Sequence, residues 1–210
     1  VDPFSPSNKV LADIIPVLLD AGLSVMLQTK LSEKTEFKYS DYKLLDQVTV
    51  ETDNPDFSKF IAPGAPDGEF RMRQIERLTK AGNMVVVLVC PYLPEWFSDL
   101  PSFIKRLADI GVSGVWFEPL HLTTKQVKSI KGIDKYLTEE QKQKAIKSEV
   151  DYEPMMLACA KYDMPFYSHA VGSWQNIYDN IRYLYPKIMP NLQEYLSIFK
   201  RDELLTFEAF

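Results

Sequence analysis

Ionisable side chains stand where the short apolar segments of this sequence end. Lys30 closes one such segment, Glu51 lies near the end of a second, Cys90 closes a third, and Glu118 and His121 follow a fourth. If these segments are parallel strands, their carboxyl ends meet at one edge of a sheet, where ligands of α/β proteins bind. An edge with an ammonium group, carboxylates, a thiol and an imidazole suits a polar small molecule that carries both amino and carboxylate groups. The alternative is that strand ends are polar because they meet water.

A repeated pattern predicts the elements that position these residues. A helix ending in Ala-Gly or Ile-Gly, two spacer residues and an apolar strand recur as "DAGLSVMLQT", "KAGNMVVVLV" and "DIGVSGVWFE". This is the αβ unit of a parallel sheet. Neither GxGxxG nor GxxxxGK[ST] follows any strand, so dinucleotide and P-loop sites lack their fingerprint. One helix between successive strands favours a (β/α) barrel. The barrel would be partial, because four or five strands are too few to close an eight-stranded barrel. A doubly wound sheet is the competing arrangement.

The element boundaries follow from hydrophobic periodicity and from Gly and Pro punctuation. Helices are expected at 7–22, 69–82 and 99–111, with one or two helical turns at 40–47. Strands are expected at 23–30, 47–52, 83–90, 113–120 and 164–172, and a loop at 53–68. After residue 122 the pattern becomes charged and helical. Residues 1–122 are therefore predicted to form the barrel part, and residues 123–210 a helical extension packed on the same domain.

The composition narrows the class of protein. The chain has 210 residues, of which 46% are hydrophobic and 25% charged, with a net charge of −5. This length suits one domain. The acidic net charge argues against binding nucleic acid over the whole surface, although a nucleic-acid or protein substrate stays open. The longest apolar run, 84–90, is far short of the ~20 residues of a membrane span, which predicts a cytoplasmic protein with no membrane partner. Its two cysteines, Cys90 and Cys159, are typical of reduced thiols.

Four stretches carry a family resemblance through their order. They are "QTK", "VTVET", "FIAPGAPDGEFRMRQIERLTKAG" and "VVVLVCPYLPEWFSD". In this order they resemble the second half of the radical S-adenosylmethionine core, in the spore-photoproduct-lyase-like or "DNA repair photolyase" branch. That branch has a T-K strand end, an E-P-G-x-P loop, a helix beginning R-L-x-x-I-x-x-L-x-x-A-G, and a strand running into P-x-x-P. The likeness covers about residues 1–122, including the opening "VDPFSP".

The resemblance implies an incomplete TIM-like α/β barrel that binds S-adenosylmethionine. In the family, three thiolates of an upstream C-x-x-x-C-x-x-C loop hold a 4Fe–4S cluster and leave one iron open for the cofactor. This chain has no such motif, and Ala62 stands where relatives carry Glu. No metal ligand is therefore expected in this chain, and the cluster is expected only with a segment that precedes Val1.

The cofactor-binding residues are expected at the carboxyl edge. The resemblance assigns Thr29 and Lys30 to the strand end that meets the cofactor, and aims Arg71 at its carboxylate, where a guanidinium pairs in bidentate fashion. Thr49 and Glu51 alternate with valines, so both are predicted to face the barrel interior and to suit ribose hydroxyls. The alternatives are a solvated lysine, a surface ion pair of the arginine with Glu69 or Glu76, and a solvent-facing row on an edge strand.

Other residues with chemical potential have more ordinary explanations. The Cys90 thiol beside the barrel mouth could donate a hydrogen atom to a substrate radical, but a buried small hydrophobe is the commoner role. His121 and His169 lack ligand spacing, which argues against a metal site. Trp96 and Phe97 suit either a stacking platform for a ring or a hydrophobic lid on the barrel.

Three functions follow from these residues. The first is the C-terminal portion of a radical S-adenosylmethionine enzyme whose substrate stays open. The second is a cluster-less barrel that acts as a non-catalytic module for a nucleotide-like ligand or a protein. The third, an unrelated TIM-type aldolase, requires a buried Lys30 and leaves no role for Arg71.

Overall fold

The core of the protein is a parallel sheet. The computed structural model describes residues 10–23, 25–30 and 44–167, and in these residues five parallel strands form one sheet in the order β1-β2-β3-β4-β5. The strands are β1 (Met26–Thr29), β2 (Leu45–Thr49), β3 (Met84–Tyr92), β4 (Gly114–Pro119) and β5 (Phe166–Tyr167). The predicted α/β class is confirmed. A doubly wound sheet reverses its strand order at one point, and the described strands show no reversal.

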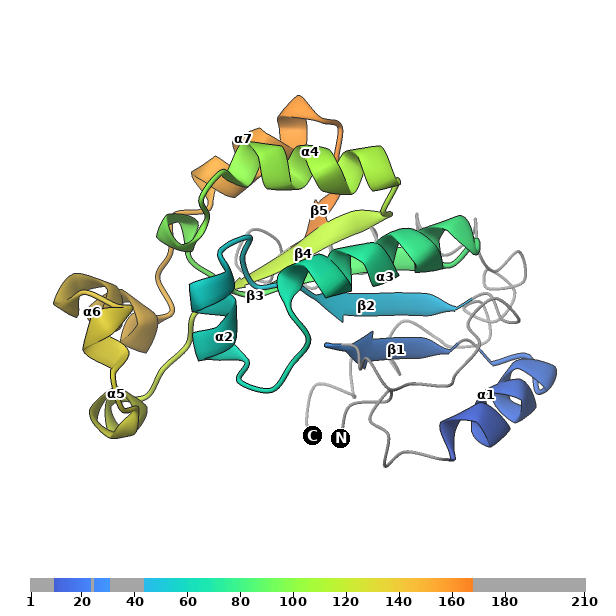
Figure 1. Ribbon diagram of the computed structural model, residues 1–210, viewed down its shortest axis with the longest axis horizontal. Helices are drawn as coiled ribbons and strands as arrows, with labels where there is room; N and C mark the ends of the chain where they lie inside the picture. Colours follow the sequence, from blue (N-terminus) through green and yellow to red (C-terminus); the bar gives the residue numbers. More distant parts are fainter. Residues whose placement is uncertain (1–9, 24, 31–43, 168–210) are drawn as a thin grey trace, which may run out of the picture. The chain divides into compact units, whose positions relative to one another are not determined.

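Helices lie between β2 and β3, between β3 and β4 and between β4 and β5 (Figure 1). The α-helices are α1 (Leu11–Asp20), α2 (Pro55–Ile61), α3 (Gly68–Lys80), α4 (Leu100–Ile110), α5 (Thr124–Ser129), α6 (Glu139–Lys147) and α7 (Glu153–Lys161). Two short 3-10 helices are η2 (Pro94–Trp96) and η3 (Ile133–Lys135). Helix α3 packs on β2 and β3 and contacts α4, and α4 packs against α7.

Alternate residues of the strands build the main core. Val48, Val87 and Val115 are fully buried and belong to one apolar cluster with residues of α3, α4 and α7. This face of the sheet is therefore the one that those helices cover. Strand β3 begins with six consecutive buried residues, as expected of a central strand that is covered on both faces.

A second apolar cluster joins the segments that follow the carboxyl ends of the strands. Trp96 of η2, Leu122 and Ile133 are among its buried members, and Phe57 of α2 packs against it. The rings of Phe57 and Trp96 stack with centroids 5.3 Å apart. This cluster fixes α2 to the segment between β4 and α6.

The element predictions hold for most of the barrel part. Helices 69–82 and 99–111 correspond to α3 and α4, and strands 83–90 and 113–120 to β3 and β4. Gly111 ends α4 with φ of 84°, a left-handed conformation that favours glycine. The predicted helix 7–22 is α1, which begins later, at Leu11; residues 7–9 lie outside the described residues.

Two boundary predictions are wrong. The helical turns expected at 40–47 are replaced by β2, which starts at Leu45 and ends at Thr49 rather than spanning 47–52; residues 40–43 lie outside the described part. Leu45 pairs with Met26 on one side and Met84 on the other, and this pairing overrides its local helix propensity. The loop expected at 53–68 contains α2, which Asn54 caps by accepting hydrogen bonds from the amides of Asp56 and Phe57.

The chain divides into two compact units, Val1–Val171 and Gly172–Phe210. All described residues belong to the first. In this unit the part beyond residue 122 contributes α7 to the core and β5, paired with β4, to the sheet. The strand predicted at 164–172 is β5 at Phe166–Tyr167, and its later residues lie outside the described part.

Candidate functional site

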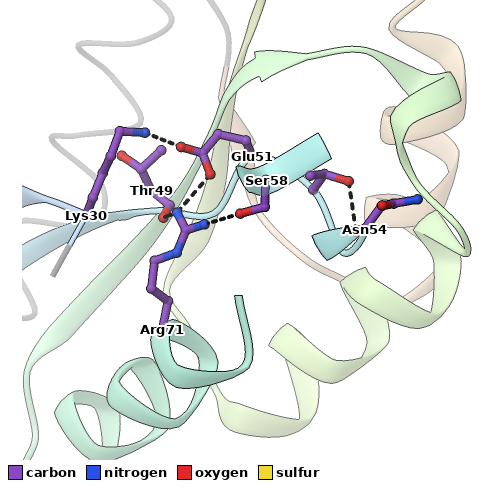
Figure 2. Close-up of polar contacts among 7 residues, drawn as sticks. Lys30, Thr49, Glu51, Asn54, Ser58 and Arg71 are labelled. Carbon is purple, nitrogen blue, oxygen red and sulfur yellow. Dashed lines mark hydrogen bonds and ion pairs between the residues drawn. The ribbon is translucent and has the colours of Figure 1, made fainter. Parts of the chain in front are cut away.

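Lys30, Glu51 and Arg71 meet at the carboxyl edge of the sheet (Figure 2). Arg71 donates from Nη1 to Glu51 Oε2 at 2.8 Å and to the carbonyl oxygen of Thr49 at 2.6 Å. From Nη2 it donates to Ser58 Oγ at 2.7 Å. Lys30 Nζ pairs with the other carboxylate oxygen of Glu51, Oε1. One carboxylate therefore lies between two cations that come from different elements.

Each member of this network arrives from a separate element. Lys30 directly follows β1, Glu51 lies two residues after β2, and Arg71 is in the first turn of α3. Asp67 fixes that turn, because its side chain accepts a hydrogen bond from the amide of Phe70 at 2.7 Å. Ser58 comes from α2. The network thus ties the start of α3 and the middle of α2 to the ends of two strands.

Burial and charge oppose each other at Glu51. Its side chain and that of Arg71 are fully buried, whereas the side chain of Lys30 is 40% exposed. Burial alone would raise the pKa of Glu51, but the charges of Arg71 and Lys30 and their hydrogen bonds outweigh it and lower the pKa below its usual value. Glu51 is therefore ionised at neutral pH, in a place where an unpaired carboxylate would be costly.

A row of ionisable groups crosses the sheet beside this network. Strand pairing aligns Thr49 with Leu88 and Val89 with Phe117, so Glu51, Cys90 and Glu118 lie at one level across β2, β3 and β4. Lys30 joins this row through its ion pair with Glu51. Burial raises the pKa of the Cys90 thiol to about 12, with a further increase from the charge of Glu118 and smaller effects of Lys30 and Glu51. All four groups therefore share one electrostatic neighbourhood.

The structure brings together most of the predicted cofactor-binding residues. Lys30, Glu51 and Arg71 are in contact, and Thr49 joins them through its backbone carbonyl. Thr29 is buried on the same side of β1 as Leu27, the opposite side from Lys30, so its side chain does not join the row.

The structure contradicts two of the competing explanations. Arg71 does not make a surface ion pair with Glu69 or Glu76, because Glu69 pairs with Arg106 and Glu76 with Lys80. The aldolase alternative needs a buried Lys30 and no role for Arg71, and neither condition is met.

The structure also places Cys90, Trp96 and His121, the other residues with chemical potential. The pKa of about 12 keeps the Cys90 thiol protonated and unreactive as a nucleophile, which fits the ordinary role better than hydrogen donation but does not test the latter. Trp96 is only 2% exposed and is packed on Phe57. Of its two alternatives, the exposed stacking platform is therefore not met, because the second apolar cluster buries the ring; the hydrophobic lid is not tested. His121 is exposed and bonds Ser148 Oγ; His169 lies outside the described residues.

Sequence reasoning missed Ser58 and its helix. The signal for α2 was present, since Asn54 followed by Pro55 is a cap residue with proline at the first helical position. A Pro- and Gly-rich surrounding segment masked it. No sequence signal indicated that Ser58 would point at Arg71.

The described residues hold neither a metal site nor a membrane span. No group of three His, Cys, Asp or Glu side chains among them is arranged to hold a metal ion. Within the same part of the chain, no helix has the length and apolar character needed to cross a bilayer.

Comparison with known proteins gives one distant relative. No model of a known protein family matches the sequence. The chain is 32% identical over 161 residues to the uncharacterized protein ORF301 of Acidianus two-tailed virus. The match covers 66% of this chain and 52% of that protein, so the chain spans about half the length of the relative.

Proposed function

We propose that this chain forms the carboxyl-edge cradle of a radical S-adenosylmethionine-type partial (β/α) barrel and that it binds S-adenosylmethionine. The observation that carries the proposal is the meeting of Lys30, Glu51 and Arg71 at the carboxyl edge of the sheet. The family resemblance covers the strand ends and the helix start from which these residues come. The unreversed strand order supports the barrel, because each strand of a (β/α) barrel joins the same edge of the growing sheet.

The charges of the row match those of the ligand. S-adenosylmethionine carries an ammonium group, a carboxylate and a sulfonium centre. In the proposed complex the ligand's ammonium replaces Lys30 at Glu51, and Lys30, which is the partly exposed member of the network, turns to the ligand's carboxylate. Glu118, farther along the row, faces the sulfonium charge. Each charge that loses a partner gains another, which keeps the desolvation cost of the exchange low.

Arg71 has a positioning role in this proposal rather than the direct carboxylate contact that the resemblance implies. Both terminal nitrogens of its guanidinium already donate to protein acceptors. It is also fully buried. Arg71 therefore holds Glu51 ionised and correctly oriented for the ligand.

The residues of this chain do not fit a 4Fe–4S cluster. Such a cluster on three thiolates needs three ionised cysteines, and the sequence contains two. Burial raises the pKa of both Cys90 and Cys159 to about 12, and Cys159 lies in the core. No reaction step through a cluster is therefore assigned to these residues.

Calorimetric titration with S-adenosylmethionine tests the proposal. We expect the wild-type chain to bind it and to bind S-adenosylhomocysteine, which lacks the sulfonium charge, more weakly. Lys30→Met should weaken binding about 10- to 100-fold, the value of one hydrogen bond to a charged group. Lys80→Met is the matched control, because Lys80 pairs with Glu76 on the exposed surface of α3. A wild-type chain that binds neither compound, or a Lys30→Met variant that binds like the control, overturns the proposal.

A second candidate is the non-catalytic module that binds a nucleotide-like ligand or a protein. It is favoured by the poor fit of Cys90 and Cys159 to a cluster. The coding sequence directly upstream of Val1 distinguishes the two candidates. An in-frame C-x-x-x-C-x-x-C supports the enzyme, and a start codon at that place supports the module.

A further inference from the structure

A buried acid–amide pair joins the beginnings of β2 and β3. Asp46 is fully buried and Asn83 is 6% exposed. Asn83 Nδ2 donates to Asp46 Oδ2 at 2.7 Å. The pair lies at the amino end of β2, whereas the network around Glu51 lies beyond its carboxyl end. It is therefore separate from the proposed ligand site.

Two side-chain oxygens of this pair lack a hydrogen-bond partner. The other oxygens of the two side chains, Asp46 Oδ1 and Asn83 Oδ1, are buried and accept no hydrogen bond. An ionised carboxylate and an amide oxygen are both acceptors, so neither can satisfy the other. A single proton on Asp46 Oδ1 changes this, because the protonated acid can donate to Asn83 Oδ1 while Oδ2 still accepts from Nδ2.

The surroundings of Asp46 favour its neutral form. Its direct neighbours in the sheet are Leu27 and Val85, which both belong to the apolar core. The charged residues on the helices that pack around this part of the core are Asp13 and Asp20 on α1 and Glu76, Arg77 and Lys80 on α3. None of these is among the causes that shift the pKa of Asp46. A buried carboxylate without a cationic partner is costly, and protonation removes the cost.

We propose that Asp46 and Asn83 form a proton-operated lock, in which protonated Asp46 donates to Asn83 Oδ1 and closes a two-hydrogen-bond ring between the beginnings of β2 and β3. Release of the proton to solvent opens one side of the ring and leaves two buried acceptors unpaired. Burial raises the pKa of Asp46 from 3.8 to about 6, an effect only partly offset by the Asn83 hydrogen bond. The lock is thus closed in mildly acidic solution and open at neutral pH.

The sign of the stability change follows from this shift. The folded protein binds the proton of Asp46 more tightly than the unfolded chain does. The stabilisation is therefore complete below pH 3.8 and is lost as the pH rises through about 6. The shift corresponds to about a 100-fold change in the unfolding equilibrium constant between these limits.

Asp46→Asn is the decisive variant, because its amide imitates the protonated acid. It offers an N–H to Asn83 Oδ1 and an oxygen to Asn83 Nδ2 at every pH. In denaturant titrations we expect the variant to match wild type near pH 4 and to have an unfolding equilibrium constant about 100-fold smaller at pH 8. Asp163→Asn, which changes an exposed aspartate, is the control and should show no such pH-dependent difference.

Three results would overturn the lock. The first is an Asp46→Asn variant whose stability differs from wild type equally at all pH values. The second, measured on the wild-type chain alone, is a carboxyl ¹³C signal of Asp46 that titrates near 4 rather than near 6. A monovalent cation is the rival occupant of the two free oxygens. The third result is that potassium chloride stabilises wild type, but not the variant, more than choline chloride does at pH 8. That result would show that a cation binds the two oxygens and would refute the protonation of Asp46.

Discussion

Replacement of Arg71 by methionine should expose the cost of the buried network at the carboxyl edge. The substitution preserves much of the apolar stem but removes the guanidinium that donates to Glu51, Thr49 and Ser58. Glu51 is then buried with Lys30 as its remaining cation in the described part of the network. Breaking a buried ion pair by removing one partner costs about 3–5 kcal/mol, a large share of the roughly 5–15 kcal/mol that stabilises a typical domain.

A double-mutant cycle separates the ion pair from simple loss of packing. Glu51→Leu alone leaves a buried guanidinium short of one acceptor, and should also destabilise the fold. In the double variant neither charge is left unpaired, so its loss of unfolding free energy should be smaller than that of Arg71→Met alone. The residual loss, about 1–3 kcal/mol, reflects the unsatisfied acceptors of Thr49 and Ser58.

Denaturant unfolding followed by tryptophan fluorescence measures these energies, because Trp96 is buried in the folded chain. Arg106→Met is the matched control. It breaks the ion pair with Glu69, whose side chains are 44% and 65% exposed, and should cost less than about 1 kcal/mol. Equal losses for Arg71→Met and Arg106→Met, or a double variant whose loss equals the sum of the single losses, would refute the account of a coupled buried pair.

Two further predictions concern the thiols and a helix end. Desolvation raises the pKa of both Cys90 and Cys159 to about 12. Alkylation by iodoacetamide at pH 8, followed by mass spectrometry, should therefore be slow in the native chain and fast in denaturant, and rapid native labelling of either thiol would contradict its raised pKa. Gly111 ends α4 with φ of 84°, and Gly111→Ala should cost about 1–2 kcal/mol because an alanine is strained there. Thermal unfolding measures the loss, and an unchanged or raised melting temperature would show that the helix end relaxes.

Most helices and strands within residues 1–122 were predictable because their sequence signals are local. Gly-terminated helices such as α3 and α4 carry a 3.6-residue pattern, and β3 is a continuous apolar run. The start of β2 was not predictable in the same way. Leu45 and Asp46 read as a helical turn, and only pairing with β1 and β3 makes them a strand.

The candidate site was predictable in its residue types but not in its connections. Strand-end position pointed to Lys30 and Glu51, and side-chain alternation predicted that Glu51 faces away from the neighbouring valines. The partner of Arg71 was beyond the sequence, because Glu69 and Glu76 are closer along the chain and offer the same charge. The choice of Glu51 depends on how α3 is placed over β2, which is a property of tertiary packing.

Strand β2 has a buried acid near each end, and the two respond to pH in opposite directions. Asp46 stabilises the fold fully below pH 3.8 and loses this contribution as the pH rises to about 6. Glu51, whose pKa is lowered from 4.5 by cations that outweigh its burial, contributes fully above 4.5 and loses its contribution as the pH falls through the lowered value. The two contributions therefore change in opposite directions just below pH 4.5, and between 4.5 and about 6 their sum falls because only the Asp46 contribution is changing. The proposed protonation of Asp46 at the amino end of β2 thus occurs in a pH range where Glu51, beyond the carboxyl end, still keeps its charge.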